Sequence, residues 1–184
     1  MNVKLLTLMS ALVLLGSNGS AASAMDLLAK YPLPNLPQSV EMLPEAVNPR
    51  RLELSLSKRE LSLYSGDTLV KTYPVAVGKA GWETPVGEHK ISAMYKDPPW
   101  RHWDGGAVIP GGDPDNPLGS RWIGFWEGKT QTGAVGVAGF HGTTPAKRSS
   151  IGDAVSHGCV RMYSEDIEEL FDLVELGVTV KVVR

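Results

Sequence analysis

The sequence predicts a mostly β domain with one short amphipathic helix near the C-terminus. The chain has 184 residues, 42% of them apolar and 21% charged, which is enough for one folded domain with its own core. Twenty glycines and thirteen prolines favour many turns, and therefore short strands rather than long helices. Several segments alternate apolar and polar residues, as strands with one buried face do.

The predicted domain spans residues 51–184, and its expected strands can be taken in order. Leucines alternate with polar residues from Leu52 to Leu56, which indicates a first strand. A hairpin with a glycine turn at Ser65-Gly66-Asp67 follows, and Pro74 marks its second strand as an edge strand or a bulge. The further expected strands are Glu88–Met94, Arg121–Trp126, Val135–Phe140 and the alternating valines at 178, 180 and 182.

One helix is predicted, over Glu165–Leu176. Ser164 is the expected N-cap, acidic residues fill the first turn, and Gly177 supplies the stop. The apolar residues follow the i, i+3, i+4, i+7 spacing of a helix with one buried face, at Ile167, Leu170, Phe171 and Val174.

Two segments are expected to precede the domain. Residues 1–24 carry one charge, Lys4, then the apolar run Leu5–Leu15 and the small-residue site Ala22-Ser23-Ala24, which is the layout of a cleaved secretory signal peptide. The apolar run is too short for a membrane span, so no stable span is expected after cleavage. Residues 25–50 contain five prolines and are predicted to form an extended linker.

The single cysteine, Cys159, calls for an explanation in an exported protein. It has no partner for an internal disulfide, and a lipid anchor is excluded because that needs a cysteine at the cleavage point. Composition leaves two readings open, a small buried hydrophobe or a nucleophile. The net charge of −2 and the lack of a Lys/Arg block argue against nucleic acid as the main partner.

The stretch from Phe140 to Met162 favours a nucleophile. It holds two of the four histidines and the only cysteine. An imidazole near a thiol either lowers the thiol pKa or takes its proton during attack. We expect His141 to be the base, because spatially adjacent catalytic pairs usually come from separate elements, and we assign His157 a structural or oxyanion role.

The residues around Cys159 fit the same chemistry. Gly158 lets backbone approach a substrate, and successive N–H groups around His157–Cys159 would converge on a developing oxyanion. Arg161 would pair with a substrate carboxylate. Zinc held by His141, His157 and Cys159 is the metal alternative, which we disfavour because no second Cys/His cluster supplies a fourth ligand.

Four of the five tryptophans lie within residues 100–126. Trp122 and Trp126 alternate with Ile123 and Phe125 in an expected strand, which favours a role in the core. For Trp100 and Trp103 a lid or glycan-stacking role and a core role remain equally open.

H-G-T at His141 followed by S-H-G-C-V-R-M at Ser156 resembles the signature of the YkuD-type L,D-transpeptidase catalytic domain, which cross-links bacterial peptidoglycan. The resemblance also covers Val77-Gly78-Lys79, Thr84-Pro85-Val86-Gly87, Asp97-Pro98-Pro99-Trp100, Asn116-Pro117-Leu118-Gly119 and Ser150-Ile151-Gly152. It therefore implies a β-sandwich of that type over about residues 51–184.

The resemblance implies a role for each matching position. Cys159 attacks a stem-peptide carbonyl and expels the terminal D-alanine, His141 activates the thiol, and the Gly142 carbonyl orients the His141 ring. His157 and Gly158 surround the oxyanion together with Cys159. Ser156 and Arg161 shape the donor site.

The implied partner is therefore a peptidoglycan stem peptide, and the implied location is the periplasm or the cell wall. Exchange of one amide for another through a thioester keeps the bond energy and needs no cofactor. Two alternatives stay open: an L,D-carboxypeptidase or hydrolase that uses the same site, and a wall-binding module without catalysis. The sequence indicates no oligomeric state.

Overall fold

The structure, a computed structural model, describes residues 49–102, 105–129 and 135–184. The predicted signal peptide and all but the last two residues of the predicted linker lie outside the described residues. The elements are, in chain order, β1 (Arg50–Ser55), β2 (Glu60–Ser65), β3 (Thr68–Pro74), β4 (Val77–Gly78), β5 (Gly87–Lys90), β6 (Ala93–Lys96), β7 (Trp100–Arg101), β8 (Val108–Ile109), β9 (Arg121–Lys129), β10 (Val135–His141), η1 (Pro145–Ser150), β11 (Ala154–Ser156), β12 (Val160–Arg161), α2 (Ser164–Leu173) and β13 (Thr179–Val183).

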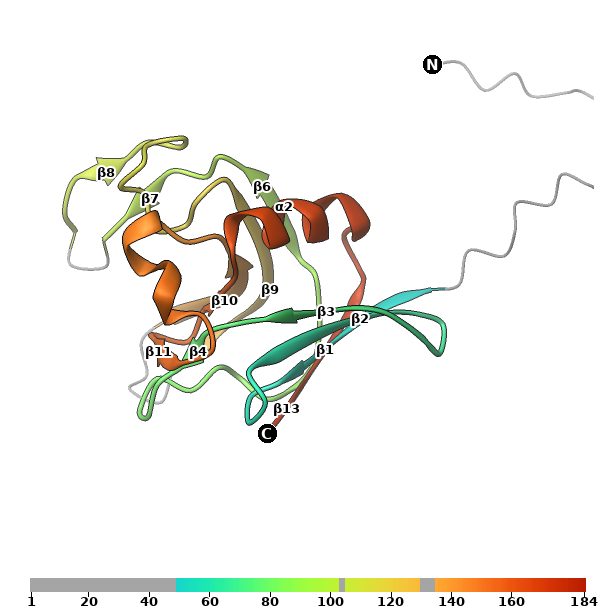
Figure 1. The fold of residues 1–184 in the computed structure, drawn as a ribbon. Coiled ribbons are helices and arrows are strands. Elements are labelled where there is room, and N and C mark those ends of the chain that lie inside the picture. The colour runs from blue at the N-terminus through green and yellow to red at the C-terminus, as the bar shows by residue number, and fades with distance from the viewer. Residues whose placement is uncertain (1–48, 103–104, 130–134) are drawn as a thin grey trace, which may run out of the picture. The chain divides into compact units, whose positions relative to one another are not determined.

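Two main sheets and two short two-stranded pairs, β11-β4 and β7-β8, make up the described domain, which confirms the predicted mostly β sandwich (Figure 1). The first has five strands in the order β3-β2-β1-β13-β5, and the second has four in the order β12-β10-β9-β6. One cluster of buried apolar side chains draws on both sheets and on α2. Burial of this apolar surface is what holds the sheets together.

The first sheet follows the alternation in the sequence closely. Leu52 and Leu54 of β1 are fully buried, and β13 pairs parallel to β1 with Val180 opposite Leu52. The predicted hairpin is confirmed as β2 and β3, with Gly66 in the left-handed region at φ 57°. β3 ends at Pro74 and is an edge strand, as that proline predicts.

Two expectations were wrong in detail. The expected strand Glu88–Met94 is divided: β5 belongs to the first sheet and β6 to the second, so the chain crosses between sheets at Ile91-Ser92. The helix α2 ends at Leu173 rather than Leu176, and Tyr163 occupies the N-cap. The Ser164 hydroxyl does not cap the helix, because it donates to the carbonyl of Thr143 at 3.2 Å.

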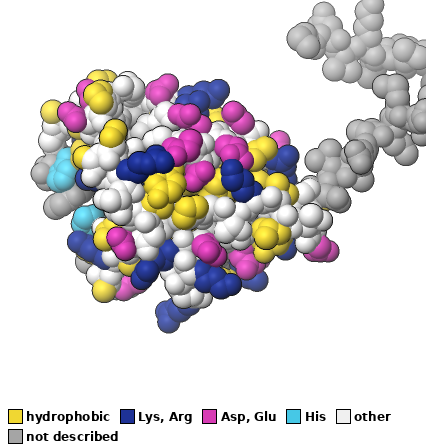
Figure 2. Space-filling view, viewed as in Figure 1, with side chains coloured by type: hydrophobic (Ala, Val, Ile, Leu, Met, Phe, Trp, Pro, Cys, Tyr) yellow, Lys and Arg dark blue, Asp and Glu magenta, His cyan; other side chains and the backbone are white. Residues whose placement is uncertain are grey.

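The acidic residues of α2 form ion pairs and a hydrogen bond with neighbouring elements. Glu169 pairs with Lys71 of β3 at 2.6 Å, and Glu165 pairs with Arg148 of η1. The Ser120 hydroxyl donates to Glu168. The face seen in Figure 2 accordingly mixes acidic and basic side chains rather than separating them.

Candidate active site

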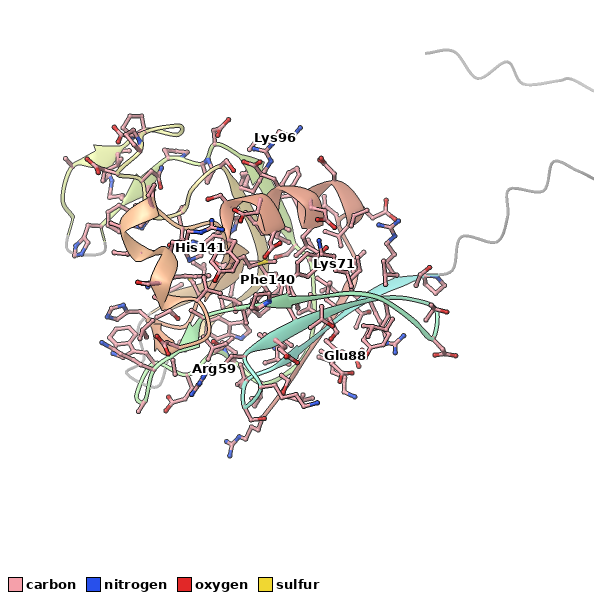
Figure 3. The ribbon with its side chains drawn as sticks, in the orientation of Figure 1. Arg59, Lys71, Glu88, Lys96, Phe140 and His141 are labelled. Carbon is pink, nitrogen blue, oxygen red and sulfur yellow. The ribbon has the colours of Figure 1, made fainter. Side chains whose placement is uncertain are left out.

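The candidate site lies on the face of the four-stranded sheet that points away from the core. β10 pairs in parallel with β12, and the register sets Phe140 opposite Val160 and His141 opposite Arg161. Phe140 and Val160 are fully buried core residues, so strand alternation turns His141 and Arg161 to the other face. Figure 3 labels the two neighbours Phe140 and His141 at the end of β10. Cys159 directly precedes β12 and shares the face of Arg161. The pairing of β10 with β12 thus brings the segment that contains Cys159 alongside the end of β10, where His141 lies.

A backbone contact fixes the ring of His141. Its Nδ1 lies 2.7 Å from the carbonyl oxygen of Gly142, and because a carbonyl can only accept, Nδ1 is the donor. Nε2 therefore keeps its lone pair. Burial and the nearby Arg161 charge lower the pKa of His141 to about 4, although the carbonyls of Gly142 and Pro117 oppose the shift. At neutral pH the imidazole is uncharged and able to accept a proton.

The thiol of Cys159 is also neutral at rest. Its Sγ is half-buried and donates to the carbonyl of Val137 at 3.7 Å. Burial raises the pKa of the thiol, while the Gly139 backbone and the Arg161 charge offset part of that rise. The sequence left open whether the imidazole lowers the thiol pKa or takes its proton, and these directions favour proton transfer during attack.

Arg161 supplies positive charge beside the thiol. Its guanidinium is partly buried, which lowers its pKa, and no described residue accepts a hydrogen bond from it. Lys79 and Lys147 add positive charge near His157. A cation beside the nucleophile favours a substrate with a carboxylate nearby.

The loop before Cys159 is closed by Ser156. This serine is 1% exposed, and its hydroxyl donates to the Cys159 carbonyl and accepts from the N–H of Gly158 at 3.2 Å. The sequence assigned Ser156 to substrate binding and Gly158 to the oxyanion donors. In the structure both groups are engaged inside the loop, because a tight loop must satisfy its own buried polar groups. Ser156 therefore holds the shape of the loop that carries Cys159.

The backbone N–H groups of His157 and Cys159 are the candidate oxyanion donors. No described residue accepts a hydrogen bond from either. The His157 ring is exposed and meets Trp82 edge-on, with ring centroids 4.8 Å apart. We therefore expect His157 to contribute its backbone N–H to the site, while its ring contacts Trp82.

Thr84 braces this loop from outside and was not singled out by sequence reasoning. Its hydroxyl donates to the Gly158 carbonyl at 3.0 Å and accepts from the Gly78 N–H at 3.1 Å. Gly158 has φ 107°, a conformation that a side chain disfavours, so the loop needs both the glycine and the brace. The sequence signal that could have identified Thr84 was the motif Thr84-Pro85-Val86-Gly87, which is part of the family resemblance.

Asn116 braces the other side, near His141. Its amide nitrogen donates to the carbonyls of Pro98 and Pro110 at 2.9 and 3.0 Å, and its oxygen accepts from the N–H of Leu118 at 2.9 Å. The turn held in this way lies against Gly142, because a Cβ on Gly119 would come within 3.1 Å of the Gly142 Cα. The anchor of the His141 ring therefore depends on Asn116.

The tryptophans separate into different environments. Trp126 packs against the core, as predicted. Trp122 was expected there too, but it pairs with His141 across β9 and β10 and its ring stacks on that imidazole. Trp100 meets His102 edge-on at 5.3 Å, and Trp103 lies outside the described residues.

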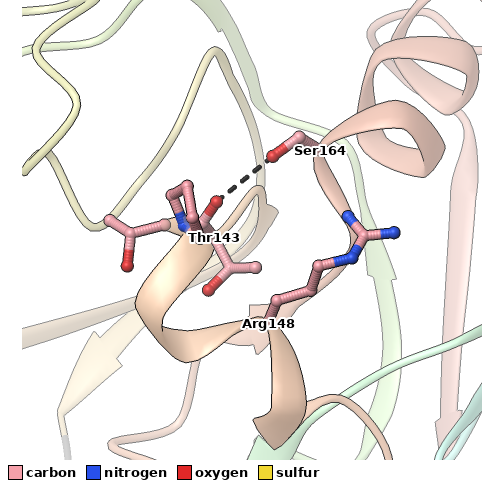
Figure 4. A pocket seen from close by; sticks show the side chains of 5 residues that line it. Thr143, Arg148 and Ser164 are labelled. Carbon is pink, nitrogen blue, oxygen red and sulfur yellow. Dashed lines mark hydrogen bonds between the residues drawn. The ribbon is translucent and has the colours of Figure 1, made fainter.

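Two hollows flank the turn that follows His141. A cavity of about 100 Å³ is lined by Thr143, Thr144, Pro145, Arg148 and Ser164 (Figure 4). A second, of about 240 Å³, lies on the other side of Thr143 towards Asp97 and Asn116. Cys159 lines neither, so the hollows border the anchor of the base rather than the nucleophile.

Metal binding has no support in this arrangement. Among the described residues, no group of three or more His, Cys, Asp or Glu side chains is placed to hold a metal ion.

Comparison with known proteins gives one family. The model of the L,D-transpeptidase catalytic domain, YkuD, matches residues 49–183. The chain is 37% identical over 121 residues to YqjB of Bacillus subtilis, a candidate L,D-transpeptidase, and this match covers 66% of the chain and 64% of YqjB. It is 30% identical over 175 residues to YkuD of the same species, with 95% of the chain and 87% of YkuD covered. It thus spans just under two thirds of YqjB and most of YkuD.

Solved structures share the fold. The catalytic domain of an Enterococcus faecium L,D-transpeptidase superposes with a TM-score of 0.53 at 20% identity, over 75% of this chain and 99% of that one. The Ldtfm-avibactam carbamoyl enzyme superposes with a TM-score of 0.56 at 21% identity, over 73% of this chain and 49% of that one. These identities carry the fold alone.

Proposed function

Because the chain belongs to the family of L,D-transpeptidase catalytic domains, we propose that it forms cross-links between peptidoglycan stem peptides through a Cys159 thioester. The observation that supports the proposal is the parallel pairing of β10, which ends at His141, with β12, which follows directly after Cys159, together with the Gly142 anchor of the His141 ring. Family membership confirms the resemblance seen in the sequence. The cysteine mechanism and the cross-linking reaction are the proposed steps.

The reaction begins with proton transfer. Nε2 of neutral His141 takes the thiol proton as Cys159 Sγ attacks the carbonyl of the diaminopimelate-like residue of the donor stem. The C=O bond opens to an oxyanion, which accepts from the N–H groups of His157 and Cys159. The imidazolium then returns its proton to the amine of D-alanine, the C–N bond breaks, and the acyl group remains on sulfur.

An amine of a second stem resolves the thioester. His141 takes a proton from this amine as it attacks, and the C–S bond breaks to regenerate the thiol. The new amide has the same bond type as the one broken, so no energy source is required. Arg161 and its neighbouring cations would hold the donor carboxylate while the carbonyl is at the sulfur.

The proposed site of action is outside the cytoplasmic membrane, in the periplasm or the wall, after removal of residues 1–24. Among the described residues, no helix is long and apolar enough to cross a bilayer. The family's substrate, stem peptide, lies on that side of the membrane.

The thiol is tested first, with a carbapenem. Intact mass spectrometry of the purified protein is expected to show one covalent adduct, and Cys159→Ala is expected to show none. A wild-type protein that stays unmodified while its thiol still reacts with iodoacetamide would overturn the acyl-enzyme proposal and favour the wall-binding module.

The acceptor is tested with muropeptides. A cross-linked dimer with loss of D-alanine supports transfer to an amine. A tripeptide as the sole product would overturn transfer and assign an L,D-carboxypeptidase that uses the same residues.

A further inference from the structure

Trp122 of β9 stands directly beside the proposed base. The β9–β10 register sets Trp122 opposite His141, and the two rings stack with centroids 6.1 Å apart and planes 22° apart. This separation and angle fall in the range of offset aromatic pairs. The indole therefore lies along one face of the imidazole.

Two glycines make room for the indole. Gly124 and Gly139 are register partners on the same sheet face as Trp122 and His141. A Cβ on Gly124 would lie 2.9 Å from the indole Nε1, and one on Gly139 would lie 2.7 Å from Cζ2. At Gly124 the indole is the nearest obstacle to a side chain, whereas at Gly139 a Cβ would also lie 2.7 Å from the carbonyl oxygen of Ile123.

The indole thus extends from the base towards the nucleophile. Gly139, which lies beneath it, is the β10 residue level with Cys159, and its backbone also interacts with the thiol. Trp122 is half-buried and is not among the core side chains, whereas Trp126 on the same strand packs against the core. Core packing therefore does not account for Trp122.

The His141 ring needs a second constraint. Its Nδ1 bond to Gly142 fixes one edge of the ring, but rotation about χ2 is soft and allows the plane to tilt. A flat partner against the ring face removes that tilt. It also excludes water, in agreement with the lowered pKa of His141.

We propose that Trp122 is a positioning residue whose indole, seated on Gly124 and Gly139, holds the His141 imidazole with Nε2 directed towards Cys159. This inference rests on the proposed function, since it assigns His141 as the base. It does not require Trp122 to touch the substrate.

The test replaces Trp122 and follows both the rate and the base. Trp122→Ala is expected to lower the rate of carbapenem acylation roughly 10- to 100-fold, the scale of a misplaced catalytic group. It should also raise the pKa of His141 towards 6.5, measured by NMR titration of the ring, so the acid limb of the acylation profile moves to higher pH. Trp122→Phe keeps a flat ring and should recover most of both effects.

Trp126→Phe is the matched control, because it changes a tryptophan of the same strand on the opposite face. It should lower the melting temperature and leave the acylation rate per folded molecule and the His141 pKa as in the wild type. Equal effects from Trp122→Ala and Trp126→Phe, or an unchanged His141 pKa in Trp122→Ala, would overturn the positioning role.

A double-mutant cycle tests whether Gly124 provides the space that the Trp122 indole occupies. The Cβ of Gly124→Ala meets only the Trp122 ring at short range, with Ala93 Cβ next at 3.5 Å. Gly124→Ala should therefore slow acylation in the wild type and add almost nothing in the Trp122→Ala background. Additive losses of acylation rate would show that Gly124 does not act through the Trp122 indole.

The proposed function can fail separately. If wild-type protein does not react with a carbapenem, the acyl-enzyme proposal fails. The His141 titration and iodoacetamide labelling of Cys159 still decide whether Trp122 controls the ring.

Discussion

The two faces of the four-stranded sheet use the same strands for different purposes. On the inner face, Ala138, Phe140, Ile123 and Val160 are at most 1% exposed and belong to the core. On the outer face, the alternate positions of β9 and β10 carry the proposed base and its indole neighbour, and the proposed nucleophile directly precedes β12. A strand fixed by packing on one side can hold reactive groups on the other without asking them to contribute to folding.

Phe140 and His141 show the difference within two residues. Phe140 is held by apolar contacts, including a ring contact with Phe125 at 4.8 Å. His141 is held by a hydrogen bond and a stacked ring. We therefore expect stability to depend on the inner face and reactivity on the outer face.

The largest effect is expected at Cys159. Cys159→Ala removes the sulfur that carries the acyl group and should abolish acylation altogether. The half-buried thiol makes one long contact, so thermal unfolding should hardly change. Intact mass and calorimetry measure both quantities, and a large loss of stability would contradict the division between faces.

His141→Ala follows. Loss of a general base should slow acylation about 10²- to 10⁴-fold near neutral pH. The deficit should shrink at alkaline pH, where the thiol ionises without help. A rate-against-pH profile that coincides with the wild type would show that another group takes the proton.

On the inner face, Phe140→Ala should lower the free energy of unfolding by about 3–5 kcal/mol, the usual cost of truncating a buried phenylalanine. The acylation rate per folded molecule should stay at the wild-type level. If this variant does not fold, Ile123→Val offers a milder change of about 0.5–1.5 kcal/mol. Chemical denaturation gives the free energies of unfolding. A lower acylation rate without a loss of stability would contradict the expectation that the inner face controls stability and the outer face reactivity.

Sequence patterns anticipated the inner face better than the outer one. Alternating leucines and valines gave β1, β2 and β13, because each strand buries every second residue against one core. The motif around Cys159 and the choice of His141 needed only short strings of residues. The strand predictions and the motif assignments both depend on residues that lie within a few positions of one another in the sequence.

A β-bulge explains the error at Trp122. Strict alternation along β9 would send Trp122 and Trp126 to the same face. The register instead shifts between Ala138 and Gly139, so Phe125 and Trp126 both turn towards the core while Trp122 stays outside. No residue pattern in Arg121–Trp126 marks that shift.

Contacts between distant segments were equally hidden. The Thr84 hydroxyl donates to the Gly158 carbonyl, 74 positions away in the sequence. The Ser156 hydroxyl accepts from the Gly158 N–H, which the sequence analysis had assigned to the oxyanion. Such contacts depend on loop conformation, which composition and periodicity do not encode.

Acidic pH should destabilise the folded protein through His141, which lies on the outer face. The pKa of His141 is about 4 in the folded protein against an ordinary value of 6.5, so between these pH values the unfolded chain binds more protons. The contribution of His141 is therefore complete above pH 6.5 and is lost as pH falls towards 4, for a total of about 3 kcal/mol. Denaturation at pH 7 and pH 4 should show this loss, and His141→Gln should reduce it. An equal loss in that variant would assign it to other groups.

The smallest effect is expected at Thr84, which belongs to neither face yet braces the loop that carries Cys159. Thr84→Val keeps the shape but leaves the buried groups of Gly78 and Gly158 without a partner, at a cost of roughly 1–3 kcal/mol in unfolding free energy. Because Gly158 lies next to the nucleophile, a looser loop should also slow acylation, whereas Thr84→Ser keeps the hydroxyl and should restore both. Stability lost by Thr84→Val with an unchanged acylation rate would mean that the loop holds its shape without the brace, and that the outer face is organised by β10 and β12 alone.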